Sequence, residues 1–350
     1  MSRSTASPIS RGSSRAVAAT TERPFVAASL ARLPLFPLGR LAQGRLAQGR
    51  VPLGLVAVGL LLVGLLGCEN AAKKSVERAT PHVTRLVETM TNDVAELERG
   101  MPRAAPILAA ELFPREKVDA DAGADAGKKS ARSPLSDPQA LKRVMERVRS
   151  KDADLRLAKS TFFAVAKPDG TVLRNDQQQD LMAGRGLFGA YPELKQALTS
   201  KTLVRSRGSL AEAAGVRGRP DAQWVVASAL REAGEPDGAV KGLYVSGWSW
   251  SSYAYRLENA LKSWIDDEHQ AEKEPVVYAF VLVDGAVYGA PIAPEANIEA
   301  IAGLKLLEGL AVGATATREL ELSGRAFGVV AQRVPALGEG VGVAILRTET

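Results

Sequence analysis

Residues 161–174 read TFFAVAKPDGTVLR, and residues 275–289 read PVVYAFVLVDGAVYG. In each stretch a short apolar run is followed by an Asp-Gly pair and by a second short run. Apolar runs of this length bounded by turn residues predict strands, and Asp-Gly favours the tight turn of a β-hairpin. The two pairs, Asp169-Gly170 and Asp284-Gly285, lie 115 residues apart. The sequence therefore predicts two hairpins of the same design.

The segments after each hairpin follow the same order. After the first, leucines at helical spacing predict a helix over 180–200, and strands are predicted at 202–207, 223–230 and 240–250. After the second, apolar residues from Ile298 to Leu310 predict a helix, followed by strands at 317–322, 325–333 and 342–347. An amphipathic helix over 253–268 joins the halves. We expect an α+β fold with two antiparallel sheets, each of order ββαβββ.

A helix precedes both halves. Apolar residues from Val76 to Leu97 form a narrow stripe at helical spacing. Pro81 interrupts the pattern early, so the helix is expected to begin at or after Thr80, and Gly100, Pro102 and Pro106 are expected to end or kink it. Residues 116–134 read EKVDADAGADAGKKSARSP, a composition that buries little apolar surface. The expected organisation is a membrane-proximal helix at 69–113, a flexible linker at 114–137, a first module at 138–270 and a second at 271–350.

The positive charge of the chain lies in its leader. The sequence has 45 Lys and Arg and 39 Asp and Glu, a formal charge of +6. Eight of the basic residues and one acidic residue lie in residues 1–67, so residues 68–350 carry 37 basic and 38 acidic side chains. Nucleic-acid binding needs basic residues clustered on the folded domain, so it is not expected here. Residues 1–50 are expected to be a disordered basic leader.

An uncharged segment follows the leader. Residues 51–67 read VPLGLVAVGLLLVGLLG, after three arginines and before the single cysteine, Cys68. A positive region, an apolar region and small residues at its end are typical of an export signal. The sequence Leu65-Leu66-Gly67-Cys68 resembles the lipobox of bacterial lipoproteins, which implies lipidation at Cys68. The alternative is an uncleaved transmembrane helix over 51–67. Both place the rest of the chain outside the cytoplasm, on the periplasmic side, and anchored to a membrane.

The repeated order resembles a known family of sensors. The stretches FFAVAKPDGTVLRND, GLFGAYPELKQALTSK and WVVASALREAGEPDGAVKGLYVSG are similar to the strand, turn and helix pattern of Cache domains. Two PAS-like modules behind a long helix resemble the double Cache domains of bacterial extracytoplasmic sensors. The resemblance implies a small-molecule ligand in the first, membrane-distal module. It also implies that the helix at 80–99 either runs along the sheets or pairs with its counterpart in a homodimer.

Aromatic residues gather near the end of the first module. Tyr244, Ser246, Trp248 and Trp250 have the same parity, so on a strand they share one face. Such rings form either the wall of a ligand pocket or the core between sheet and helix. Arg205 and Arg207 share a strand face and either clamp a carboxylate or stay solvated. The candidate ligand-binding residues are Tyr191, Arg207, Trp224, Tyr244 and Trp248.

Enzymatic chemistry has no support in the sequence. The motifs of serine hydrolases, zinc proteases, P-loop proteins and dinucleotide-binding proteins are missing, so no catalytic residue, cofactor or metal is expected. The favoured function is an exported, membrane-anchored sensor or small-ligand-binding module without its own effector domain, which implies a separate signalling protein as partner. The alternative is a structural or accessory envelope lipoprotein that uses the fold for protein contacts.

Overall fold

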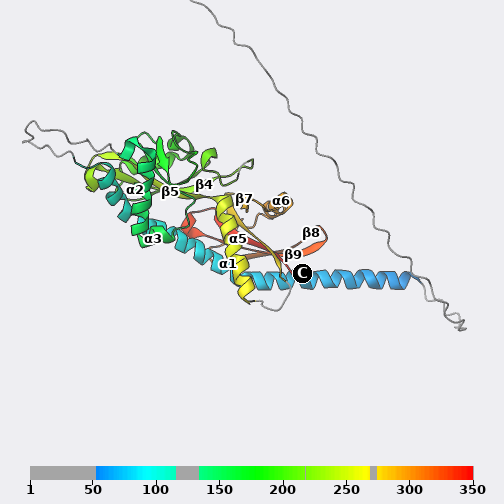
Figure 1. Cartoon of the computed structure of the whole chain (residues 1–350). Coiled ribbons are helices and arrows are strands. Elements are labelled where there is room, and N and C mark those ends of the chain that lie inside the picture. The colour runs from blue at the N-terminus through cyan, green and yellow to red at the C-terminus, as the bar shows by residue number, and fades with distance from the viewer. Residues whose placement is uncertain (1–52, 116–133, 217, 269–273, 350) are drawn as a thin grey trace, which may run out of the picture. The chain divides into compact units, whose positions relative to one another are not determined.

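The computed structural model describes residues 53–115, 134–216, 218–268 and 274–349, with side chains from residue 71 onward (Figure 1). The fold is α+β: a long N-terminal helix is followed by two modules, each built on an antiparallel sheet of five strands. Residues 53–350 belong to one compact unit. The expected leader at 1–50, the side chain of Cys68 and linker residues 116–133 lie outside the described part.

The first sheet contains β1 (Phe162–Ala166), β2 (Val172–Asn175), β3 (Val204–Gly208), β4 (Gln223–Arg231) and β5 (Val240–Ser249), in the spatial order β2-β1-β5-β4-β3. The expected hairpin joins β1 and β2. The carboxylate of Asp169 accepts the backbone N–H of Thr171 at 2.8 Å, and Gly170 takes the φ of 85° that the turn requires. The expected strand at 240–250 ends one residue earlier, because Trp250 begins the next helix.

The helix expected over 180–200 is instead two short elements, α4 (Leu187–Ala190) and the 3-10 helix η2 (Pro192–Leu198). The physical reason is the Tyr191-Pro192 pair. A residue before proline is driven out of the α-helical region by the proline ring, and Tyr191 has φ −134° and ψ 74°. We call α4 and η2 together the cap, because their buried side chains pack against one face of the first sheet.

The second sheet repeats the first. It contains β6 (Val276–Val283), β7 (Ala286–Gly289), β8 (Thr315–Leu322), β9 (Arg325–Arg333) and β10 (Val341–Thr348), in the order β7-β6-β10-β9-β8. Asp284 and Gly285 form the hairpin turn with φ values of 49° and 87°. Helix α6 (Glu295–Gly303) ends earlier than the expected Leu310, and Lys305 just beyond it has a positive φ. The expected duplication of order ββαβββ is confirmed.

Helix α1 runs without a break from Leu53 to Leu112. The expected start at or after Thr80 is therefore wrong, and of the two outcomes expected at Gly100, Pro102 and Pro106, an end or a kink, the end is wrong. Each of Pro81, Pro102 and Pro106 removes a backbone hydrogen bond, which costs about 3 kcal/mol. The helix continues past these prolines because its apolar stripe is buried against the sheets from Ala79 to Leu112. The buried stripe comprises Ala79, Val83, Leu86, Met90, Val94, Leu97, Met101, Ala104, Ala105, Leu108, Ala109 and Leu112.

Helix α1 runs along both modules of the chain, next to β4 and β5 in the first and β8, β9 and β10 in the second (Figure 1). The helix backbone closely approaches Gly328 of β9, where an added Cβ would lie 2.5 Å from the backbone nitrogen of Val76. Residues of the expected dimer stripe, such as Val83 and Val94, are thus buried within the chain itself. Among residues described with side chains, no helix is long and apolar enough to cross a membrane.

The remaining helices brace the first module and connect the two modules. Asp137 caps α2 (Pro138–Lys151), and Asp152 caps α3 (Ala153–Leu157) by accepting the N–H of Leu155 at 3.1 Å. Asp152 also accepts hydrogen bonds from Arg103 of α1. Helix α5 (Trp250–Glu268) leads from β5 to the second module. Short 3-10 turns lie at Pro134–Ser136, Ala211–Ala213, Glu232–Gly234 and Pro335–Leu337.

Candidate functional site

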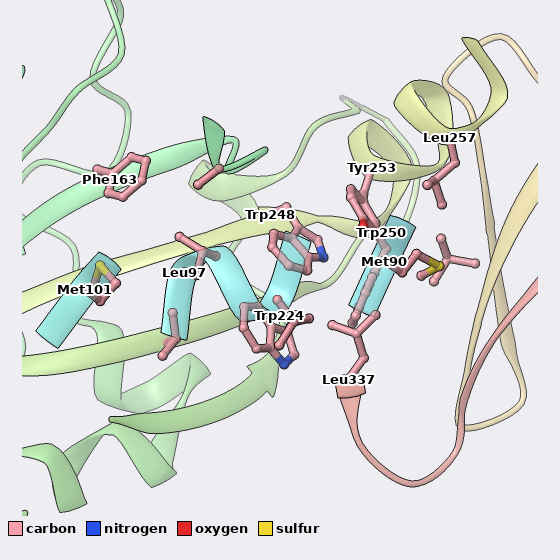
Figure 2. Packing of buried hydrophobic residues seen from close by; sticks show 14 of the residues in the cluster. Met90, Leu97, Met101, Phe163, Trp224, Trp248, Trp250, Tyr253, Leu257 and Leu337 are labelled. Atoms are coloured by element: carbon pink, nitrogen blue, oxygen red, sulfur yellow. The ribbon is translucent and has the colours of Figure 1, made fainter. Parts of the chain in front are cut away.

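Three of the five candidate ligand residues face helix α1. Trp224, Tyr244 and Trp248 are fully buried in the core between the first sheet and α1, where Figure 2 shows the two tryptophans beside Leu97. Trp248 stacks between Trp224 and Tyr253, with ring centroids 4.6 Å and 4.7 Å apart. A ligand that touched these rings from this side would have to displace α1.

A buried hydrogen bond joins α1 to α5 beside these rings. The Tyr253 hydroxyl donates to the carboxylate of Asp93 at 2.7 Å, and both groups are buried. Burial removes water from the carboxylate and raises the pKa of Asp93, while the charges of Arg256 and Lys159 offset part of that shift. Burial likewise raises the pKa of Tyr253, so its hydroxyl stays protonated and can donate.

Asp93→Asn is expected to raise the free energy of unfolding at neutral pH. Because the folded pKa of Asp93 is raised, the unfolded chain loses its proton first, and stability falls as pH rises from the ordinary aspartate pKa through the folded value. Asparagine keeps the acceptor for Tyr253 and does not ionise. Urea unfolding measured over a range of pH should show a gain that disappears toward acidic pH. Asp267→Asn on the exposed end of α5 is the control. A gain independent of pH would contradict this account.

Tyr191 joins α4 to η2 within the cap, on the opposite face of the sheet. It is fully buried in an apolar cluster that includes Phe162 of β1 and Leu187 and Leu194 of the cap. Its hydroxyl donates to Oε1 of Gln223 at 2.6 Å, and the same oxygen accepts the backbone N–H of Leu210 at 2.8 Å. These two bonds fix the orientation of the Gln223 amide. Its nitrogen, Nε2, is buried and has no hydrogen-bond partner among the described residues.

Gln223 is adjacent to Trp224 on β4, so the two side chains point to opposite faces of the sheet. The sequence pattern draws attention to the aromatic face, and this glutamine is not among the candidate ligand-binding residues. The signal that was available is its position: it is a lone amide at the start of the apolar run WVVASAL. Buried polar groups inside an apolar strand require partners, so such a residue is a candidate for a binding role.

A second missed residue, Asp221, fixes the loop before β4. Its carboxylate accepts hydrogen bonds from the Ser249 hydroxyl at 2.7 Å, the Ser251 hydroxyl at 3.2 Å and the Gly215 N–H at 2.8 Å. These contacts tie the loop to the end of β5 and the beginning of α5. Asp221 is therefore satisfied by the protein itself, in contrast to Gln223.

Arg207 lies at the junction of the two modules. Its guanidinium is 3.1 Å from the carboxylate of Asp284 in the second hairpin and donates to the carbonyl of Glu339 at 3.2 Å. Arg205 pairs with Glu98 of α1. Both arginines thus have carboxylate partners within the chain, and a ligand carboxylate would compete with those partners. The structure does not bring Arg207 together with Tyr191 in one site.

Comparisons with known proteins concern the fold. No protein-family model matches the sequence, and no curated protein sequence matches it. An extracellular ligand-binding receptor of Desulfohalobium retbaense is 13% identical over 76% of this chain, with a TM-score of 0.42, and this chain covers 39% of its length.

This chain matches two chemoreceptor ligand-binding domains over almost their whole length. The ligand-binding domain of the Pseudomonas aeruginosa amino acid chemoreceptor PctC, in complex with GABA, is 14% identical over 79% of this chain and 99% of its own, with a TM-score of 0.40. The ligand-binding domain of the Pseudomonas fluorescens chemoreceptor CtaA, in complex with L-alanine, is 11% identical. The match covers 78% of this chain and 96% of that domain, with a TM-score of 0.42. The description of the fold as two PAS-like modules rests on the strand order given above.

Proposed function

We propose that this chain is an exported, membrane-anchored sensor module that binds a small polar molecule between the first sheet and the cap. The observation that carries the proposal is Nε2 of Gln223, a buried donor without a partner among the described residues. Leaving such a donor unpaired costs about 1–3 kcal/mol. An oxygen of a small ligand would accept from it, and the neighbouring Tyr191 hydroxyl would serve as a second polar contact.

The cap is short and is held on the sheet by few side-chain hydrogen bonds. Helix α4 has four residues and no side-chain hydrogen bond at its N-cap, and η2 is a 3-10 helix. Their side-chain ties to the sheet are the Tyr191–Gln223 bond and a bond from Ser206 to Glu193. Leu187 and Leu194 of the cap are fully buried, so opening would expose apolar surface, and ligand binding would have to offset that cost. Opening of the cap would admit a ligand without disturbing α1.

The sheet itself offers a route from this site to α1. Gln223 and Trp224 are neighbours on β4, and Trp224 packs in the core shared with α1. A ligand that shifts Gln223 therefore acts on the opposite face through a single strand. Helix α1 begins at Leu53, inside the apolar segment at 51–67. We infer anchoring by lipid on Cys68 or by that segment. Membrane fractionation of Cys68→Ser distinguishes the two, since release indicates lipid and retention indicates a helix.

The ligand proposal is tested by thermal unfolding of the full chain with panels of amino acids, organic acids and amines. At least one compound should raise the melting temperature, because binding to the folded state alone stabilises it. Gln223→Glu keeps the acceptor oxygen and removes the donor, so it should weaken binding of that compound at least tenfold. Gln179→Glu, at an exposed position of the same module, is the matched control.

Two results would overturn the proposal. If no compound stabilises the protein, the accessory function by protein contacts is favoured. If a compound binds equally well to Gln223→Glu, the ligand lies elsewhere than beneath the cap.

A further inference from the structure

The second module contains a pocket of about 350 Å³ between the β6–β7 hairpin, helix α6 and the loop that follows α6. Its volume lies within the range of small-molecule sites. Tyr191 and Gln223 of the proposed cap site belong to the first module, so this pocket is separate from that site. No residue of the cap site lines the pocket. We infer that this pocket is a second binding site, specific for a small amphipathic monocarboxylate.

The lining of the pocket is apolar on one side and charged on the other. Leu282 of β6, Ile301 of α6 and Leu306 of the following loop are buried and provide an apolar surface. The charged lining residues are Asp284, Lys305, Glu308 and Arg333. This division suits a ligand with a hydrocarbon body and one polar end.

The ion pairs around the pocket leave one positive charge without a carboxylate. Asp284 is paired with Arg207 at 3.1 Å, and Lys305 with Glu308 at 3.2 Å. Arg333 donates from Nε to the carbonyl of Leu310 and from Nη2 to that of Leu307, both at 2.6 Å. In the described ranges no carboxylate forms a salt bridge with Arg333.

Arg333 therefore selects the sign of the ligand charge. A half-buried guanidinium that binds only carbonyl oxygens keeps its full charge, and a carboxylate is the partner that suits it best. Its Nη1 atom is not used in the two hydrogen bonds to the loop. A ligand carboxylate at Nη1 would add to these bonds without breaking them. An amine of the same length would meet like charge and should be rejected.

The position of Arg333 also couples the ligand to the loop. Arg333 lines a second hollow of about 500 Å³, together with Leu310 and Val312 of the same loop and Val341 of β10. The loop lines both hollows. It has positive φ at Lys305 and Gly309, and Arg333 donates hydrogen bonds to its carbonyls at Leu307 and Leu310. A carboxylate on this guanidinium should therefore order the loop.

The test is calorimetric titration of the full chain with straight-chain monocarboxylates from acetate to octanoate, with hexylamine and hexanol as matched probes. We expect saturable binding that strengthens with chain length up to the limit of the pocket, and no binding of hexylamine. Ala302→Phe projects from the exposed face of α6 into the pocket and should weaken hexanoate binding at least tenfold. Arg333→Gln should weaken it by a similar factor.

Matched controls separate the site from the rest of the module. Ala296 is exposed on the same helix outside the pocket, and Arg318 is exposed on β8. The variants Ala296→Phe and Arg318→Gln should therefore bind hexanoate as the unmodified protein does. Gln223→Glu should also leave hexanoate binding unchanged, which keeps this result independent of the cap site. The inference is overturned if no acid binds, if hexylamine binds as well as hexanoate, or if Ala302→Phe binds hexanoate unimpaired.

Discussion

Leu97→Asp is expected to unfold the first module or leave it barely stable. Leu97 is fully buried between α1 and the first sheet, beside the stacked tryptophans (Figure 2). Loss of a buried leucine costs roughly 2–5 kcal/mol, and an unpaired buried carboxylate adds several more. Most domains have only about 5–15 kcal/mol of total stability, so the sum is comparable with the whole.

Urea unfolding followed by circular dichroism and tryptophan fluorescence measures this effect. Asn92→Asp is the matched control, because it introduces the same side chain on the exposed face of the same helix. Its unfolding midpoint should stay near that of the unmodified protein. Equal midpoints for Leu97→Asp and Asn92→Asp would show that α1 does not pack on the sheet in solution.

Gly328→Ala is expected to push α1 away from the second sheet. The added Cβ would lie 2.5 Å from the nitrogen of Val76 and 2.8 Å from the carbonyl oxygen of Ala72, and both atoms belong to the helix backbone. A backbone cannot move aside as a flexible side chain does, so either the helix or β9 must shift. Overpacking of this kind costs about 1–3 kcal/mol, and the rigid contact places the expected loss at the upper end.

Hydrogen exchange measured by mass spectrometry identifies where that loss occurs. In Gly328→Ala the amides of residues 72–87 should exchange faster, while those of residues 97–112, which pack on the first module, should be little changed. Gly303→Ala at the end of α6 is the control, because no atom lies within 4 Å of its added Cβ. Uniform exchange along α1 would mean that Gly328 is not the point of contact.

The strands were predictable because their signals are local. Each hairpin is marked by an Asp-Gly pair between apolar runs, and the structure places Asp169 between β1 and β2 and Asp284 between β6 and β7. The two connections differ in length, since the first spans 167–171 and the second is Asp284-Gly285 alone. The end of α1 was not predictable by the same reasoning. Local rules begin the helix near Pro81 and end or kink it near Pro102, but burial of the stripe on two sheets outweighs the lost hydrogen bonds. Those sheets are formed by distant parts of the sequence.

The candidate site was also predictable only where the signal is local in the sequence. Strand parity correctly placed Tyr244 and Trp248 on one face, but parity cannot say which face α1 covers and which the cap covers. The prominent rings lie on the side of α1, and the cap side holds Tyr191 and Gln223. The unpartnered donor of Gln223 becomes visible only when its neighbours are known. Its role in binding remains a proposal.

The sharing of α1 by both sheets determines the order in which the chain can assemble during synthesis. The part of the helix near Val76 and Thr84 meets Gly328 and Gln332, about 250 residues later in the sequence. At about 5–20 residues per second, translation brings these partners together only after tens of seconds. An isolated helix is marginal in water, so its apolar residues stay exposed meanwhile. We therefore expect folding in two stages, with the first module formed early and the nascent chain dependent on chaperones until β9 and β10 emerge.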